Sequence, residues 1–416
     1  MKRVAITGLG AITPLGNSVP EFWKNILAGK SGAGPITKFD ASKFKTNFAC
    51  EVKGFNPEDY IEKKEIRKYD LFTQYAIAAS DEAIKDAGLD FEAMPQHERF
   101  DVGVIWASGN GGITTFEEQL KEFHTGDGTP RFNPFFIPKI IVDIAAGVLS
   151  IRNGLHGPNY ATVSACASSN TAIIAAFDTI RLGKATIMIA GGSEAALTAS
   201  SIGGFNSSHA LSKRNDNPQA ASRPFDKDRD GFVAGEGAGA LILEDYDHAL
   251  ARGATIYAEI VGGGMAADAY HLTGTPPDGL GAALGMTKAL ADANITADKI
   301  DYINAHATST GQGDLSELNA ISKVFTGIPV AIGATKSMTG HLLGAVGAVE
   351  SIISVLAIRD GIIPPTINTV NIDENVPSGL NLVLGKAQKA DITYVLNNTF
   401  GFGGHTASTI FKRASP

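Results

Sequence analysis

The sequence predicts an α/β protein built from two similar halves. Runs of Val, Ile and Ala that are typical of strands alternate with Ala-rich segments that are typical of helices, as in RVAITGLG, FWKNILAG, DLFTQYAIAASDEAIKDAG and DVGVIWASG. This alternation is the usual pattern of α/β proteins, and most of the 47 glycines lie at the ends of the strand-like runs. A second observation, an internal repeat, predicts that the fold is duplicated.

The repeat consists of two long segments with the same order of elements. The first, YATVSACASSNTAIIAAFDTIRLGKATIMIAGG, predicts a strand, a sharp turn, an apolar helix that ends near Arg181, and a second strand. The second, VAIGATKSMTGHLLGAVGAVESIISVLAIRDG, has the same order, and its helix ends near Arg359. Both helices are apolar on nearly every side, so we expect them to be buried at the centre. We divide the chain into residues 1–253 and 254–416.

Composition and charge exclude several classes of protein. The chain has 416 residues, 44% hydrophobic and 19% charged, and its 43 acidic against 35 basic residues give a net charge of −8. This acidic balance argues against bulk binding of nucleic acid. The two cysteines, Cys50 and Cys166, are far apart, which excludes a disulfide framework and a paired-cysteine metal site.

The apolar segments predict neither a membrane span nor a signal peptide. No run approaches the roughly 18 apolar residues of a membrane-spanning helix. The N-terminal segment MKRVAITGLG is interpreted as a first strand. The two isolated cysteines indicate the reducing cytoplasm, and the apolar segments indicate no membrane partner.

Two sequences imitate ligand-binding loops and depart from them at decisive positions. In VAITGLGAITPLG, Thr13 stands where the third glycine of a dinucleotide-binding loop belongs, and Pro14 follows it. The segment DKDRDGFVAGEG, which starts at Asp226, has the spacing of a calcium loop but ends on Gly237 in place of the required glutamate. We expect the second segment to be a solvated acidic turn.

Cys166 is the candidate nucleophile. A cysteine among Val, Ala and Ser is most often an inert core residue, but Cys166 follows a predicted strand and precedes the buried helix of the first repeat. Free amides at a helix N-terminus lower the pKa of a thiol and can hold an oxyanion. Cys50, in TNFACEVKGF, has no such turn and is interpreted as structural.

Two histidines are candidate partners of this cysteine. His306 lies in DYINAHATSTGQGD, and His341 lies in GATKSMTGHLLGAVGAVE, close to Lys336. A single histidine on a buried segment is more often a core residue. His341, however, occupies the second repeat at the turn that corresponds to the turn of Cys166. A duplicated fold would bring the two turns together, so we expect Cys166 and His341 to share one site.

Four motifs, VSACASS, NAHATST, ATKSMTGHLLGAVG and NNTFGFGGH, together resemble those of β-ketoacyl-[acyl-carrier-protein] synthases. The resemblance is closest to the type II condensing enzymes of fatty-acid synthesis and covers essentially the whole chain. It implies a thiolase-like fold, in which two βαβαβαββ halves form a five-layered αβαβα core, and a homodimer.

The resemblance also implies a role for each residue of the site. Cys166 would accept an acyl group from acyl carrier protein, and the amides of Cys166 and Phe402 would hold the oxyanion. His306 and His341 would donate hydrogen bonds to the thioester oxygen after malonyl carrier protein loses its carboxylate. Lys336 would order the site, which must exclude water.

Further residues match the family's substrate contacts. Gly401 to Gly404 would form a flexible turn with Phe400 and Phe402 as a gate, although a glycine-rich turn before a C-terminal strand is the simpler interpretation. Substrate-binding positions are Thr308, Thr310, Asn110 and Gly401, the two threonines as partners of the 4'-phosphopantetheine arm. No separate cofactor is expected, because that arm arrives on the carrier protein.

Lys64, Arg67 and Lys68 match a basic patch that docks the acidic carrier, and a solvated helix face is the alternative. Four further residues match positions at which some members of the family hold a monovalent cation: Asn304, Glu350, Asn397 and Asn398. A buried hydrogen-bond network among them is the alternative.

The chain departs from the family's pattern at four positions: Ala307, Thr406, His209 and Asn110. The most consequential is Asn110, which stands where an isoleucine usually lines the acyl tunnel.

Alternatives remain within and outside the enzymes. The chain could be a type I synthase, a specialised polyketide or polyene ketosynthase, or a non-catalytic chain-length-factor-like subunit. Cys166 argues against the last, because such subunits lack the nucleophile. A thiolase would need a second catalytic cysteine, and Cys50 lies in the wrong motif.

Overall fold

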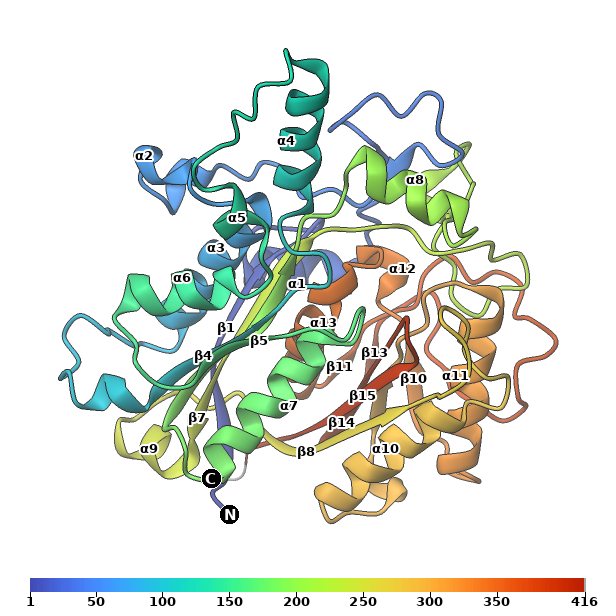
Figure 1. The fold of residues 1–416 in the computed structure, drawn as a ribbon. Helices are drawn as coiled ribbons and strands as arrows, with labels where there is room; N and C mark the ends of the chain where they lie inside the picture. Colours follow the sequence, from blue (N-terminus) through green and yellow to red (C-terminus); the bar gives the residue numbers. More distant parts are fainter. Residues whose placement is uncertain (415–416) are drawn as a thin grey trace.

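A large mixed sheet runs through the molecule in the computed structural model, which describes residues 1–414 (Figure 1). Its strand order is β12-β10-β9-β14-β15-β8-β1-β7-β6-β4-β5. The first half of the chain contributes β1 (Val4–Ile12), β4 (Val102–Ala107), β5 (Asn159–Thr162), β6 (Ile187–Glu194) and β7 (Gly237–Asp245). The second half contributes β8 (Ala258–Ala267), β9 (Tyr302–Asn304), β10 (Ala331–Gly333), β12 (Asn381–Leu382), β14 (Tyr394–Gly401) and β15 (His405–Lys412).

The two halves repeat one topology. The order β5-β4-β6-β7-β1 of the first half corresponds strand by strand to β10-β9-β14-β15-β8 of the second. The directions also agree. In the first half, β4 is parallel to β5 and β6, and the pairs β6–β7 and β7–β1 are antiparallel. In the second half, β9 is parallel to β10 and β14, and the pairs β14–β15 and β15–β8 are antiparallel. The predicted duplicated α/β fold is confirmed.

Helices complete each βαβαβαββ half and form the layers. The main helices of the first half are α3 (Leu71–Asp86), α6 (Ile144–Asn153) and α7 (Ser168–Arg181). Those of the second half are α10 (Leu280–Asp292), α11 (Gly311–Val324) and α13 (Val346–Asp360). In Figure 1, α7 and α13 lie between the two halves of the sheet, with α3 and α6 on one outer face and α10 and α11 on the other. This arrangement gives the layers αβαβα.

The remaining elements are short connections and surface additions. The helices are α1 (Val19–Leu27), α2 (Lys63–Ile66), α4 (Ile113–Thr125), α5 (Phe136–Ile140), α8 (Ala199–Ser207), α9 (Tyr246–Ala251) and α12 (Lys336–Thr339). The strands are β2 (Gly34–Pro35), β3 (Phe48–Ala49), β11 (Ile362–Ile363) and β13 (Gln388–Lys389). The division at residues 253 and 254 falls between α9 and β8 and stays a prediction. Within residues 1–414, no helix has the length and apolarity needed to cross a membrane.

The central helices meet near their N-terminal ends. Nearly all of α13 is buried, as expected from its apolar sequence. The Ala348 amide of α13 donates to Ser169 Oγ of α7 at 2.9 Å. Gly347 faces Asn170, and a Cβ at residue 347 would lie 2.7 Å from the Asn170 backbone nitrogen. The two helices can approach this closely only because Gly347 has no side chain.

We expect Gly347→Ala to lower the free energy of unfolding by about 2 kcal/mol, because the added methyl group overpacks this contact. Gly204→Ala is the matched control, since a Cβ at residue 204 of α8 meets nothing within 4 Å. The control should be neutral or stabilise by up to about 1 kcal/mol. Denaturant unfolding measures both, and equal effects of the two substitutions would contradict the close contact.

Candidate active site

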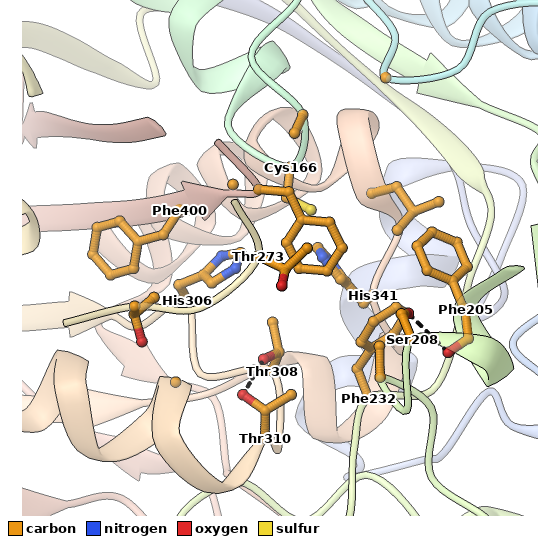
Figure 2. A pocket seen from close by; sticks show the side chains of 18 of the residues that line it. Cys166, Phe205, Ser208, Phe232, Thr273, His306, Thr308, Thr310, His341 and Phe400 are labelled. Carbon is orange, nitrogen blue, oxygen red and sulfur yellow. Dashed lines mark hydrogen bonds between the residues drawn. The ribbon is translucent and has the colours of Figure 1, made fainter. Parts of the chain in front are cut away.

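One cavity of about 380 Å³ collects the candidate residues from both halves (Figure 2). Cys166 comes from the first half, and His306 and His341 come from the second. The side chains of all three face this cavity in Figure 2. The sequence repeat predicted this meeting of Cys166 and His341, and the structure places His306 beside them.

Cys166 lies in a sharp turn between β5 and α7. The preceding residue, Ala165, has a φ of +49°, which is the left-handed region that residues other than glycine rarely adopt. The turn is held by Ser168, whose hydroxyl accepts the Ser164 amide at 2.8 Å and donates to the Ala165 carbonyl at 2.6 Å. Cys166 is therefore fixed two residues before the helix begins, and it is partly exposed to the cavity.

The predicted lowering of the Cys166 pKa is wrong. Burial raises the pKa of the thiol to about 12, and this effect outweighs the opposing effects of Lys336 and of the hydrogen bonds from the backbone amides of Cys166 and Phe402. The thiol is consequently protonated at neutral pH. Both amides nevertheless point at the sulfur, so they lie next to the carbonyl that an acylated Cys166 would carry.

The two imidazoles are neutral and nearly enclosed. His306 is 8% exposed and His341 is 3% exposed, and their ring centroids are 5.4 Å apart. Burial and the charge of Lys336 lower the pKa of both rings well below the usual value. Neither Nδ1 atom has a hydrogen-bond partner within residues 1–414. Both rings line the cavity, so a bound ligand can meet them there.

The positions of the two histidines are set by their backbones. His306 follows β9, and the amides of His306 and Ala307 donate to the buried carboxylate of Glu317 at 2.9 and 2.8 Å. His341 follows α12, and its amide donates to the Val233 carbonyl at 2.7 Å. These bonds keep the rings aimed at the cavity.

Lys336 forms a buried ion pair beside the site. Its Nζ lies 2.6 Å from Glu350 Oε1, and each side chain is 1% exposed. Burial raises the pKa of Glu350 to about 7, against the attraction of Lys336. A buried pair of this kind is expensive to break, since either partner alone would be an uncompensated charge. The pair thus fixes a positive charge close to both imidazoles.

The glycine-rich turn after β14 lies against the nucleophile. Phe402 is 37% exposed and lines the cavity, whereas Phe400 is 8% exposed with its ring centroid 5.5 Å from that of His306. A Cβ at Gly401 would lie 2.6 Å from the Ser164 carbonyl and 2.9 Å from the Cys166 amide nitrogen. Glycine is needed at residue 401 for this approach.

The predicted substrate contacts also line the cavity. Thr308 and Thr310 have hydroxyl oxygens 3.1 Å apart, and Asn110 lies on the wall with Gly401. Figure 2 shows the two threonines on the same side of the cavity. Asn110 puts a polar side chain on a wall that is otherwise largely apolar.

The four residues considered for a cation do not converge on one point. The Asn397 amide donates to Ser351 Oγ and the Gly347 carbonyl, toward α13, whereas the Asn398 amide donates to Glu317, toward the outer layer. Successive residues of a strand face opposite sides, so these two side chains cannot share a ligand. The Asn304 amide donates a hydrogen bond to Asn397 Oδ1. The Thr335 hydroxyl contacts both Asn304 Oδ1 and Glu350 Oε1 at hydrogen-bond distance. The structure has a hydrogen-bond network here.

The candidate docking residues lie away from the cavity lining. Lys64 pairs with Glu62 at 2.8 Å and Lys68 pairs with Glu65 at 2.6 Å. Arg67 is exposed and forms no ion pair with any described residue. His209, at a φ of +56°, is exposed near the cavity mouth.

The sequence did not predict the role of one buried residue behind the cavity wall. Glu194 ends β6 and is fully buried, and its carboxylate accepts the amides of Gly109, Asn110 and Gly344 at 2.8, 3.0 and 2.9 Å. It thereby ties cavity walls from the two halves together. The only signal in the sequence is an acidic residue at the end of the apolar run IMIAGGSE.

A duplicated αβαβα fold with a cysteine and two neutral histidines around one cavity defines the class of thiolase-fold condensing enzymes. Two family models match the chain: "Beta-ketoacyl synthase, N-terminal domain" over residues 1–249 and "Beta-ketoacyl synthase, C-terminal domain" over residues 257–370. The chain belongs to the beta-ketoacyl synthase family.

Individual relatives agree with this assignment. The chain is 47% identical over 416 residues to "3-oxoacyl-[acyl-carrier-protein] synthase 2" of Vibrio cholerae, with 99% of each chain covered. A solved beta-ketoacyl synthase from Burkholderia phymatum is 37% identical with a TM-score of 0.92, and a type II PKS ketosynthase solved in complex with its acyl-carrier protein is 35% identical with a TM-score of 0.88. Both structural matches cover 100% of each chain.

Proposed function

We propose that the protein is a type II 3-oxoacyl-[acyl-carrier-protein] synthase of fatty-acid elongation. It condenses acyl carrier protein with malonyl carrier protein and releases 3-oxoacyl carrier protein, carbon dioxide and free carrier protein. The observation that supports this function most directly is the shared cavity of one thiol and two neutral imidazoles. Full-length relatives that bear this name support the same reaction.

Acyl transfer comes first and needs no permanent thiolate. The sulfur of Cys166 attacks the thioester carbon of the acyl carrier protein, and the amides of Cys166 and Phe402 hold the oxyanion that forms. When the intermediate collapses, the bond to the carrier's sulfur breaks, and the proton of Cys166 passes to that sulfur. A thiol with a pKa of about 12 is protonated in the resting enzyme, so it reacts only slowly with alkylating and oxidising reagents.

Decarboxylation and condensation follow. His306 and His341 each donate a hydrogen bond from a neutral ring to the malonyl thioester oxygen, so that loss of carbon dioxide leaves a stabilised enolate. The α-carbon of the enolate attacks the acyl carbon on Cys166, and collapse of the second oxyanion breaks the carbon–sulfur bond. The Cys166 sulfur leaves as a thiolate and takes up a proton from solvent. Burial, helped by the charge of Lys336, keeps both rings neutral.

The substrate's arm and its carrier complete the site. Thr308 and Thr310 bind the phosphopantetheine arm, and the turn with Phe400 and Phe402 closes over the loaded acyl chain. The carrier protein supplies the arm, so the enzyme needs no resident cofactor. A related ketosynthase has been solved with its acyl-carrier protein, which supports a carrier as the partner. Arg67, with Lys64 and Lys68, contributes basic charge for docking.

We further propose a homodimer that works in the cytoplasm. Strand β5 is an edge of the sheet, and Tyr160 on it is 43% exposed. Phe132 packs on Phe136 at 5.1 Å between ring centroids, and Ile137 beside them is 59% exposed. An uncovered strand edge and an exposed aromatic cluster are each typical of an interface.

The alternatives are not favoured. A non-catalytic chain-length-factor-like subunit lacks the nucleophile, whereas this chain has Cys166 in the cavity with both histidines. Type I and specialised polyketide or polyene ketosynthases share the fold, but the full-length relatives at 47% identity bear the name of the type II elongating enzyme. Asn110 on the cavity wall is the feature that bears on acyl-chain preference.

Acylation of the protein tests the nucleophile. Incubation with an acyl carrier thioester should add one acyl mass to the wild-type chain and none to Cys166→Ala, as measured by intact-protein mass spectrometry. Cys50→Ala is the matched control and should be acylated normally, because Cys50 is buried outside the cavity. Labelling of Cys166→Ala would overturn the assignment.

The histidine roles predict a split between two partial reactions. His306→Ala and His341→Ala should each slow malonyl-carrier decarboxylation by about 100-fold or more and acyl loading by less, because only decarboxylation depends on their hydrogen bonds. Release of carbon dioxide and acyl mass gain measure the two steps. His97→Ala, on the exposed surface, is the control. Normal decarboxylation with lost loading would refute these roles.

The lowered histidine pKa values predict a flat pH profile. Both rings stay neutral when the pH falls from about 8 to about 6, so decarboxylation by Cys166→Ala should show no loss of kcat/KM in that range from imidazole protonation. The measurement is kcat/KM against pH. Because Glu350 has a pKa of about 7, the ring signals of His306 and His341 are followed by NMR over the same range, and their titration near about 6.5, the value of a free imidazole, would contradict the lowered pKa values.

A further inference from the structure

The segment that imitates a calcium loop has a different use in the fold. Asp226 is fully buried, and its carboxylate accepts the amides of Asp228, Val370 and Asn371 at 2.9, 2.7 and 2.8 Å. The expectation of a solvated acidic turn is therefore wrong for Asp226, although Asp228 and Asp230 are exposed. The residue between them, Arg229, has a side chain that is only 2% exposed.

The Arg229 guanidinium is surrounded by oxygen atoms from three segments. It donates to the carbonyls of Thr310 at 3.0 Å and Asp226 at 2.6 Å, to the carbonyl of Gly311, and to Asp373 Oδ2 at 2.8 Å. Asp314 Oδ2 lies 3.6 Å from its Nε. Carbonyl and carboxylate oxygens are the ligands of a hard cation, and here a fixed guanidinium supplies the positive charge.

The same segment holds the loop between β9 and α11 at further points. The Gly231 amide donates to the Ser309 carbonyl at 3.1 Å, and the Arg223 amide donates to Ser309 Oγ at 2.9 Å. Asp314 accepts the amides of Ser309 and Thr310 at 3.0 and 3.3 Å.

Ser309 has a φ of +69°, a conformation that costs free energy in a residue other than glycine. Such a conformation persists only where its surroundings enforce it, and the hydrogen bonds of Ser309 with Gly231, Arg223 and Asp314 do so.

This loop presents Thr308 and Thr310 to the cavity, whereas Arg229 does not reach the cavity itself. We propose that Arg229 is a positioning residue. It holds the loop of residues 308–311 by hydrogen bonds to the loop's own backbone carbonyls, and it thereby determines how tightly the phosphopantetheine arm binds. The proposal rests on the proposed function, because it takes the two threonines as partners of that arm. It assigns Arg229 no contact with the reacting atoms.

Arg229→Lys tests this role, since lysine keeps the charge but cannot make the forked contacts. We expect KM for acyl and malonyl carrier protein to rise by about 10-fold, with kcat within about 2-fold, because the threonines are displaced while the thiol and imidazoles are not. Alkylation of Cys166 by iodoacetamide, a reagent without the arm, should keep its wild-type rate. Arg359→Lys is the control, because Arg359 pairs with its neighbour Asp360 outside the cavity lining.

Two results would overturn the proposal in a folded Arg229→Lys protein: an unchanged KM, or alkylation slowed as much as carrier turnover, which would indicate general support of the site. If Arg229→Lys does not fold, Asp373→Asn tests the proposal instead, because it removes the charge of one carboxylate partner of Arg229 at the edge of the cluster. A KM rise of about 3-fold with unchanged alkylation is then expected, and an unchanged KM overturns the proposal. A wild-type enzyme that turns over neither carrier substrate overturns the proposed function instead.

Discussion

The contact between α7 and α13 determines where the chemistry of this protein takes place. Each helix follows a turn with a reactive side chain, Cys166 before α7 and His341 before α13, and the helices touch near the ends that adjoin these turns. The absent side chain of Gly347 sets their separation. Because the positive ends of two helix dipoles meet at the cavity, developing negative charge is stabilised there. A shift of this contact would separate Cys166 from His341.

Burial then gives the site a consistent electrostatic character. It raises the pKa of the thiol and, with Lys336, lowers the pKa of both imidazoles, so every group that meets the substrate is uncharged at neutral pH. The charged groups close by are held by partners: Lys336 pairs with Glu350, and the carboxylates of Glu194 and Glu317 each accept backbone amides. An uncharged cavity binds acyl chains readily and excludes the water that would hydrolyse an acyl-enzyme.

The sequence predicts the duplicated fold, the buried central helices and the meeting of Cys166 with His341, because periodicity and repeats are local properties of a chain. It does not predict the raised thiol pKa, because burial depends on segments distant in sequence. Glu194 and Arg229 were missed for the same reason. Their partners, Gly344 and Asp373, lie more than a hundred residues further along the chain. In the segment that resembles a calcium loop, the guanidinium of Arg229 supplies the positive charge that a bound cation would otherwise bring.

The short pairing of β1 with β8 joins the two halves into one sheet through Val4, Ala5 and Ile6. During synthesis on the ribosome, the first half emerges with this edge of β1 uncovered, and only the later arrival of β8 can cover it. Pairing between segments so distant in sequence is slow. The nascent first half therefore exposes this unpaired strand edge until the second half emerges.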